Sequence, residues 1–427
     1  MSTVSNDPNA VAGIPASTRS GPLRALASSQ FRIFWAASLL GIVSFMISTV
    51  SRGWLILDMT DSAFLVTAIN AIGMLPTLVF SLFGGVIADR VNRKLVLITC
   101  DGSSSIIVIL LMILVYTDTI QLWNLFALTM IHGTVFAISM PARATLVSNL
   151  VNHKDMASAI ALFTSAFSVS QMVGPAMAGY LINSQGMSSP FLISGIMLMP
   201  AVILLLRLKI PGAENSNKSK DQPSVMQSII QGLQYVLEHR VITGLILMGV
   251  ATTVFAMPYQ TLLPVFARDI LDVGASGLGW LGGLAGVGAI IGSVTVASSS
   301  NTRFMKFLMI VGSIGLGLFL VLFAVSTNYI FSLVTIFCLG FLFQIFMTSN
   351  FTFVQLIAPD HVRGRVVSIR MIAFGLSPFG MILLGTGAES VGPGAAVAIA
   401  GLIALALILM IIIVVPSMRH VEMEVPE

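Results

Sequence analysis

Charged residues are scarce in this sequence. Asp, Glu, Lys and Arg make up 9% of the 427 residues, against roughly 25% in an ordinary globular protein. So few charges cannot cover the surface of a soluble protein, which excludes a conventional soluble enzyme. The net charge of +4 indicates no nucleic-acid partner. The two cysteines, Cys100 and Cys338, lie in apolar stretches and are too few for a secreted disulfide scaffold.

Motifs of common enzymatic and nucleotide chemistry are also absent from the sequence. There is no Walker A pattern, no HExxH, no CxxC and no GxSxG. The sequence therefore predicts no enzyme, with no catalytic residue, metal site or cofactor, and it shows no means of driving work with ATP.

Long hydrophobic runs dominate the chain instead. Hydrophobic residues make up 56% of it, and a membrane-spanning helix needs about 20 in succession. Lipid offers the backbone no hydrogen-bond partners, so each run is expected to be helical. The predicted fold class is an all-α integral membrane protein with twelve transmembrane helices in two six-helix halves. The predicted spans are 31–57, 64–88, 95–116, 121–145, 157–182, 189–209, 241–268, 277–299, 305–325, 329–357, 366–387 and 393–416.

Polar segments divide the chain into five parts. We expect a disordered cytoplasmic tail over 1–30, a six-helix half over 31–209 and another over 241–416, with a cytoplasmic tail over 417–427. The linker, 210–240, contains apolar residues at helical spacing from Val225 to Leu237. This spacing predicts an amphipathic helix, which either lies on the lipid surface or packs the two halves together.

The basic residues favour one orientation in the membrane. With both termini in the cytoplasm, 19 of the 21 Lys and Arg residues fall on the cytoplasmic side, as the positive-inside rule requires. Arg268 falls outside and Arg52 falls within a span. We therefore predict a multi-pass protein of the inner (cytoplasmic) membrane, with both termini in the cytoplasm.

The two halves resemble each other in their glycines. Three pairs share one sequence offset, and they fall on or directly after the fifth and eleventh spans. A parallel internal repeat of this kind is typical of transporters. The pairs are Gly174 with Gly380, Gly179 with Gly385, and Gly186 with Gly392.

The segment between spans two and three reads GGVIADRVNRK. It resembles the cytoplasmic loop motif G-x-L-A-D-R-x-G-R-K of the major facilitator superfamily, with Asn92 in place of the second glycine. Asn tolerates a positive φ, so a tight turn remains possible. The resemblance implies a gating role for the matching residues Gly84, Gly85, Asp89, Arg90, Arg93 and Lys94.

The fifth span contains SVSQMVGPAMAGYL. With Gly174, Pro175 and Gly179 it resembles the antiporter motif of the same superfamily, G-x-x-x-G-P-x-x-G-G. It departs from that motif at Ser170 and Ala178, which are both small. In the superfamily this motif accompanies exporters; a proline kink with small-residue packing is the other interpretation.

Four longer phrases extend the resemblance to nearly the whole chain. They are similar to the drug:proton antiporter branch that includes enterobactin exporters and macrolide efflux proteins. This resemblance implies a monomeric carrier in the lipid bilayer that exports a small-molecule substrate, such as a drug, siderophore or metabolite, against protons by alternating access. The phrases lie at 53–67, 140–162, 262–271 and 361–380.

Ionisable residues within spans suggest a substrate or proton path, because they are expensive in a membrane. Arg52 either holds an anionic substrate group or extends to the interface. Asp101 either carries a proton or pairs with a cation such as Arg93. His132 either titrates near neutral pH or packs as a hydrogen-bonded core residue. Arg143, at the inner end of span four, is interpreted as a gate or positive-inside residue.

Uncharged polar residues are candidates for the lining of the same path. They lie on spans that line the cavity in the superfamily, which are the second, fifth, seventh and tenth. The candidates are Asn70, Gln171, Tyr259, Gln260, Gln344 and Asn350.

Other functions fit the same pattern of spans. An uptake or lipid-translocating carrier would use the same scaffold, and a membrane receptor or assembly factor that has lost transport belongs to another class. Asp89 and the Gly174–Pro175 pair favour retained transport. A channel is disfavoured because no filter or charged ring is evident.

Overall fold

The computed structural model describes residues 24–90, 92–209, 225–299 and 301–415. Within these ranges the chain is helical and contains no strand, which confirms the predicted fold class. The N-terminal half contains α1 (Ser29–Thr60), α2 (Ala63–Arg90), α3 (Arg93–Tyr116), α4 (Leu122–Leu150), α5 (Met156–Gln185) and α6 (Ser189–Arg207). The predicted tails lie mostly outside the described residues, as does the first part of the linker, 210–224.

The C-terminal half is less regular. Its first span consists of α8 (Arg240–Ala251), two π-helical turns, a 3-10 turn and the short α9 (Leu263–Val265). Pro258 and Pro264 lie in this segment and donate no backbone hydrogen bond. The eleventh span is divided into α13 (Asp360–Phe374) and α14 (Ser377–Val391), directly before Pro378. The other spans are α10 (Gly274–Ala297), α11 (Thr302–Ala324), α12 (Tyr329–Ile357) and α15 (Pro393–Val414).

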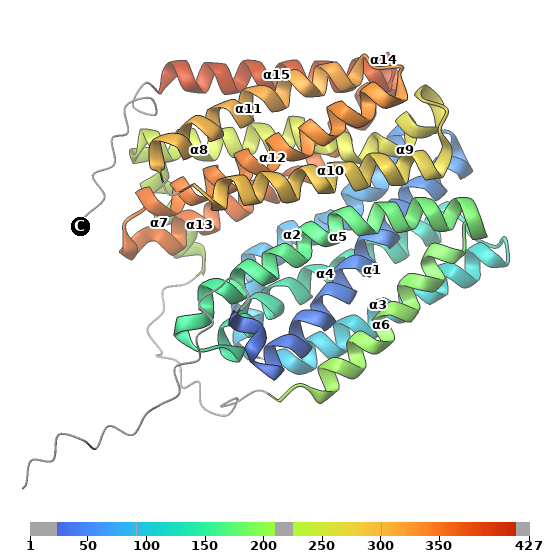
Figure 1. The fold of residues 1–427 in the computed structure, drawn as a ribbon, viewed down its shortest axis with the longest axis horizontal. Helices are drawn as coiled ribbons and strands as arrows, with labels where there is room; N and C mark the ends of the chain where they lie inside the picture. The colour runs from blue at the N-terminus through green and yellow to red at the C-terminus, as the bar shows by residue number, and fades with distance from the viewer. Residues whose placement is uncertain (1–23, 91, 210–224, 300, 416–427) are drawn as a thin grey trace, which may run out of the picture.

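Most of these helices are long and apolar enough to cross a membrane. Eleven spans of the described chain meet this criterion, and the described apolar part of α2, Ala63–Leu78, is shorter. Figure 1 shows the helices running roughly side by side. The start of α1 and the end of α15 lie at one end of the bundle, here called the termini end, and the opposite end is called the far end (Figure 1).

The glycine pairs of the predicted repeat occupy equivalent places. Gly186 and Gly392 both end a helix with positive φ, 87° and 88°, a conformation that glycine adopts without strain. A Cβ at Gly174 would lie 2.5 Å from Met46 in the first span. A Cβ at Gly380 would lie 2.1 Å from the carbonyl oxygen of Val254 in the seventh. The fifth span therefore packs on the first as the eleventh packs on the seventh.

Asn92 has another role from the one that its place in the loop motif suggested. Its φ is −61°, and its side chain caps α3 by accepting hydrogen bonds from the backbone N–H groups of Lys94 and Leu95. Asn is a favoured N-cap residue. Asn92 does not adopt the positive φ that it could have tolerated, and the residue instead begins the next helix directly.

The amphipathic helix predicted in the linker is α7 (Val225–Glu238). It contacts α13 and α8 of the C-terminal half, and a Cβ at Gly232 would lie 3.1 Å from Arg365. Ile230, Leu233 and Leu237 are exposed on its surface. The contacts that we observe thus favour packing against the C-terminal half, while one apolar stripe remains uncovered.

Buried hydrophobic residues join the two halves at the far end. One cluster contains Leu57 and Val66 of the N-terminal half together with Leu262, Phe266 and other residues of the C-terminal half. Towards the termini end each half has a cluster of its own. Phe34, Leu97 and Leu205 belong to that of the N-terminal half, and residues of α8, α12 and α13 belong to that of the C-terminal half. Among the side chains that the structure describes, which do not include those of 81–90 in α2, the halves are thus packed together at the far end and separately at the termini end.

Candidate functional site

Asp101 and Arg143 form an ion pair inside the N-terminal half. Arg143 Nη2 lies 2.5 Å from Asp101 Oδ1, and the two side chains are 2% and 6% exposed. Arg143 Nη1 also donates to the hydroxyl of Ser38 at 3.1 Å. The pair therefore connects α1, α3 and α4. We expected Asp101 to pair with a cation such as Arg93; the structure shows the pair with Arg143.

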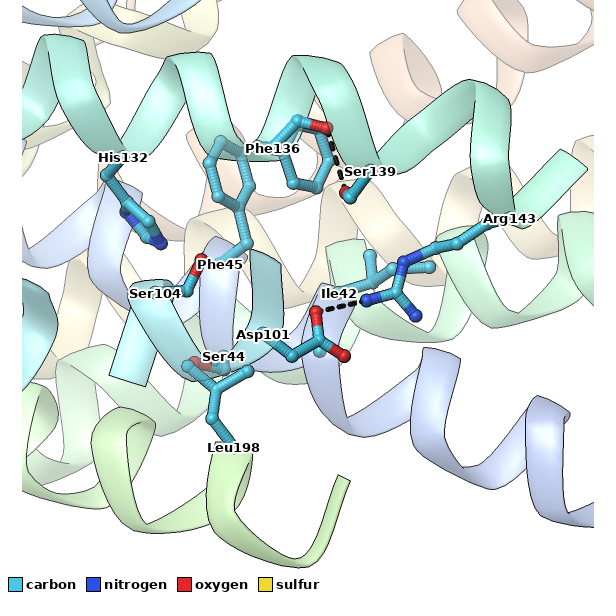
Figure 2. A pocket seen from close by; sticks show the side chains of 11 residues that line it. Ile42, Ser44, Phe45, Asp101, Ser104, His132, Phe136, Ser139, Arg143 and Leu198 are labelled. Carbon is cyan, nitrogen blue, oxygen red and sulfur yellow. Dashed lines mark hydrogen bonds and ion pairs between the residues drawn. The ribbon is translucent and has the colours of Figure 1, made fainter. Parts of the chain in front are cut away.

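A small enclosed cavity adjoins this pair. Figure 2 shows Asp101 and Arg143 with His132 and the small hydroxyl side chains Ser44, Ser104 and Ser139 around it. Its volume is about 10 Å³, which holds about one water molecule. The lining comes from α1, α3, α4 and α6. The cavity is therefore internal to the N-terminal half rather than placed between the halves.

Arg52 and His132 form a second buried pair in the same half. Arg52 Nη1 lies 3.1 Å from His132 Nδ1, and Arg52 Nη2 donates to Thr49 Oγ1 at 3.2 Å. A guanidinium has no acceptor, so Nδ1 must accept and the neutral ring carries its hydrogen on Nε2. Arg52 is 4% exposed and therefore does not extend to the interface. His132 is a hydrogen-bonded core residue that also lines the cavity.

Polar contacts cross between the halves at the far end. Arg268 of the C-terminal half pairs with Asp61 at 2.8 Å and donates to the carbonyl oxygen of Leu57 at 3.0 Å. Glu389 accepts hydrogen bonds from the Ser62 hydroxyl and the Phe64 backbone N–H, both at 3.3 Å. We call these contacts the far-end latch; its residues are Leu57, Asp61, Ser62, Phe64, Arg268 and Glu389.

The residues of the antiporter-like motif lie where α5 packs against its neighbours. Gly174 faces Met46 of α1. A Cβ at Gly282 of α10 would lie 2.4 Å from Pro175 Cβ, and one at Gly179 would lie 2.3 Å from the carbonyl oxygen of Ala275. In the described chain these small residues let α5 and α10 approach closely, and that contact joins the two halves.

The loop motif is only partly described. The backbone of α2 continues to Arg90, but the contacts of Gly84 and Gly85 and the side chains of Asp89 and Arg90 lie outside the described part of the structure. Lys94 Nζ donates to the carbonyl oxygens of Leu206 and Leu208, at 2.9 and 2.7 Å. These oxygens lie at the end of α6, where a cation is favourable.

The uncharged candidates are dispersed over the molecule. Asn70 donates to Val66 of its own helix, and Gln344 donates to Thr348. Tyr259 is buried in the shared hydrophobic cluster, whereas Gln171 and Gln260 are half-buried. The structure does not gather these residues with Arg52, Asp101 and His132 into one site.

Asn350 belongs to a polar group that the sequence pattern did not reveal. Its side chain donates to the Leu245 carbonyl oxygen at 2.9 Å and accepts from Arg370 Nε at 3.1 Å. Arg370 is 9% exposed and also lies over the ring of Phe351, 4.9 Å from its centroid. The sequence pattern places Arg370 only among the cytoplasmic cations, and it interprets Arg143 as a gate or positive-inside residue. A basic residue within the limits of a predicted span, as Arg143 is in 121–145 and Arg370 is in 366–387, is the signal that would have identified both.

Comparison with known proteins identifies relatives along nearly the whole chain. The family model described as transmembrane secretion effector matches residues 20–426. The multidrug efflux pump Tap of Mycolicibacterium fortuitum is 24% identical, over 81% of this chain and 86% of its own. The staphyloferrin A transporter of Staphylococcus aureus is 25% identical, over 84% and 90%. The enterobactin exporter of Escherichia coli is 23% identical, over 93% and 94%.

Solved structures share the fold. The nucleoside transporter NupG superposes with a TM-score of 0.68 at 12% identity, covering 92% of this chain and 99% of its own. A bacterial homologue of the lysosomal transporter Spinster, in an inward-facing and unoccupied conformation, superposes with a TM-score of 0.62 at 16% identity, covering 91% and 96%. These likenesses agree with two six-helix halves.

Proposed function

Because the chain belongs to the transmembrane secretion effector family, within the major facilitator superfamily of membrane transporters, we propose that it exports a small molecule from the cell in exchange for protons. The efflux pump and the enterobactin exporter among its relatives support the direction. The antiporter-like residues Gly174, Pro175 and Gly179 support it as well.

The observation that carries this proposal is the unequal packing of the two halves. They share one hydrophobic cluster at the far end and keep separate clusters towards the termini end. A carrier that works by alternating access needs this difference between its ends, because rocking of the halves must close one end while it opens the other. We propose that the observed state loads its substrate from the termini end.

The termini end is the cytoplasmic end in this proposal. Nineteen of the 21 Lys and Arg residues sort to that side. A single cysteine placed at Asn217, in the linker, should then react with an impermeant thiol reagent only from the cytoplasm, and one at Ser188 only from outside. Labelling of both from the same side contradicts the topology.

Transport is tested in two steps. Metabolite and antibiotic profiling of a deletion strain, with and without the gene, identifies the substrate. Efflux is then measured in energised vesicles while the proton gradient is collapsed and ATP is maintained. We expect efflux to stop. Export at the full rate without the gradient excludes proton antiport, and net uptake of the substrate reverses the proposed direction.

A further inference from the structure

The ion pair of the N-terminal half leaves one carboxylate oxygen without a partner. Asp101 Oδ1 binds Arg143, but Asp101 Oδ2 is buried and has no hydrogen-bond partner, and the same is true of Arg143 Nε. An unsatisfied buried polar atom is costly, more so on a charged group. Asp101 also lines the cavity, which holds about one water molecule. A water molecule bound there would donate a hydrogen bond to Oδ2.

We propose that Asp101 is the proton-binding group of this carrier and that Arg143 and the adjoining cavity complete its site. The inference deepens the proposed proton antiport and rests on it. The ligand is a proton delivered by water. A hydronium ion in the cavity gives one proton to Oδ2: one of its O–H bonds breaks, a new O–H bond forms from a carboxylate lone pair, and a neutral water molecule and a neutral carboxyl group remain.

The charges around Asp101 make two states mutually exclusive: Asp101 either binds a proton or forms the ion pair with Arg143. The neutral pair becomes a buried cation when the proton binds, and an uncompensated buried charge is strongly destabilising. Arg143 must then leave its position, so the protein has one arrangement with the ion pair and another with the proton.

No other charge faces Asp101 closely enough to replace Arg143 in the described structure. On α4 the other titratable group at the cavity is His132, which Arg52 of α1 holds in its neutral form. The α1 residues at the site, Ser38, Gly41 and Ser44, are uncharged, as is Leu198 of α6. On α3 itself, the thiol of Cys100 is the nearest titratable group in sequence. The pairing of Asp101 therefore depends on Arg143.

Release of Arg143 affects the helix that carries the far-end latch. The guanidinium lies against the backbone of α1, since a Cβ at Gly41 would be 2.9 Å from Arg143 Nη2. The same helix continues without a break to Leu57, whose carbonyl oxygen accepts from Arg268 of the C-terminal half. Proton binding at Asp101 thus removes a contact on α1 near Ser38 and Gly41, and the far end of the same helix holds the two halves together.

Proton binding can be measured without a transport substrate. Infrared difference spectra of the purified full-length protein in nanodiscs are recorded for a step from neutral to mildly acidic pH. We expect a C=O stretching band of a protonated, buried carboxyl group that is lost in Asp101→Asn. The matched control is Asp118→Asn, which neutralises an exposed carboxylate just after α3 and should keep the band. Asp101→Glu, which retains a carboxyl group, should keep it at a shifted frequency.

The outcomes separate this inference from the proposed function. An identical band in Asp101→Asn and the unmodified protein overturns the site at Asp101, even if efflux depends on protons. The absence of any such band in the unmodified protein overturns it as well, as does an unshifted band in Asp101→Glu. A band that only the Asp101 variants change supports the site, and a later failure of proton-coupled efflux would then count against the antiport alone.

Discussion

Glu389 of the C-terminal half accepts a hydrogen bond at 3.3 Å from the backbone N–H of Phe64, in the first turn of α2. The first N–H groups of a helix have no partner within it, and a carboxylate there also interacts favourably with the helix dipole. The start of α2 is therefore capped from across the interface. Arg268 forms an ion pair with Asp61, which lies in the short connection between α1 and α2. The contacts of Glu389 and Arg268 therefore both act on this connection.

Breaking the latch at Asp61 should favour opening of the far end. Asp61 has a φ of 53°, which Asn tolerates, so Asp61→Asn removes the charge with little change in the turn. Asp61 is largely exposed, and exposed pairs contribute up to about 1 kcal/mol, roughly a fivefold change in a population. We expect a longer distance distribution between spin labels at Ser184 and Ser390.

The matched control for this measurement is Asp269→Asn. Asp269 also contacts Arg268, at 2.6 Å, but it is the next residue in the same half. Its loss should leave the distance distribution unchanged. Equal shifts in the two variants would show that the charge of Arg268 matters without a specific pair across the interface.

Close packing of α5 on α10 should make Gly179 intolerant of a methyl group. A Cβ there would lie 2.3 Å from the carbonyl oxygen of Ala275 and 2.7 Å from Gly279, both backbone contacts. Gly179→Ala should separate the helices and destabilise the protein by about 1–3 kcal/mol, the usual cost of overpacking. The measurement is the thermal melting temperature of the purified protein in detergent.

Gly102→Ala is the control for that substitution, because a Cβ at Gly102 has open space within 4 Å. Alanine stabilises a helix interior by up to about 1 kcal/mol relative to glycine. This variant should therefore melt at the same temperature as the unmodified protein or higher. If Gly179→Ala has the same melting temperature as Gly102→Ala, the close α5–α10 contact is not important for stability.

The buried ion pair should behave as a unit. Arg143→Gln leaves the Asp101 carboxylate buried without a cation, and loss of one partner of such a pair typically destabilises by about 3–5 kcal/mol. The double variant Asp101→Asn with Arg143→Gln removes both charges and should recover most of that loss. Melting temperatures of the single and double variants provide the check. A double variant as unstable as Arg143→Gln alone would contradict the pairing.

The sequence predicted the fold because the membrane imposes it. The thickness of the bilayer fixes the length of each hydrophobic span, so the sequence locates the helices α1 to α6 within a few residues. The distribution of Lys and Arg indicates which loops lie on the same side of the membrane. The break between Phe374 and Ser377 was missed because Pro378 lies within an apolar run and hydropathy does not register a kink. The repeat was visible because Gly186 and Gly392 share one backbone requirement, a positive φ.

The site was less predictable because it depends on which helices become neighbours. Asp101, Arg52 and His132 were identified from their cost in the membrane. Their partners were not, because the residues are 42 positions apart in the Asp101–Arg143 pair and 80 apart in the Arg52–His132 pair. Arg268, the one cation that the positive-inside count left outside the cell, forms a latch with Asp61 and Leu57. That exception was the available signal for the far-end contacts.

The loop motif provides the last prediction. Asp89 lies in the last turn of α2, which extends to Arg90, and a carboxylate is unfavourable at the negative end of a helix dipole. The sequence places the cations Arg90, Arg93 and Lys94 directly after it, and charge-assisted contacts of such a carboxylate would hold the cytoplasmic gate. Asp89→Asn keeps the shape and removes the charge, so expression should stay near normal while efflux falls severely.

Asp118→Asn, in the opposite loop of α3, should transport normally. Efflux from vesicles with equal amounts of each protein makes the comparison, and a normal rate in Asp89→Asn would remove Asp89 from the gate.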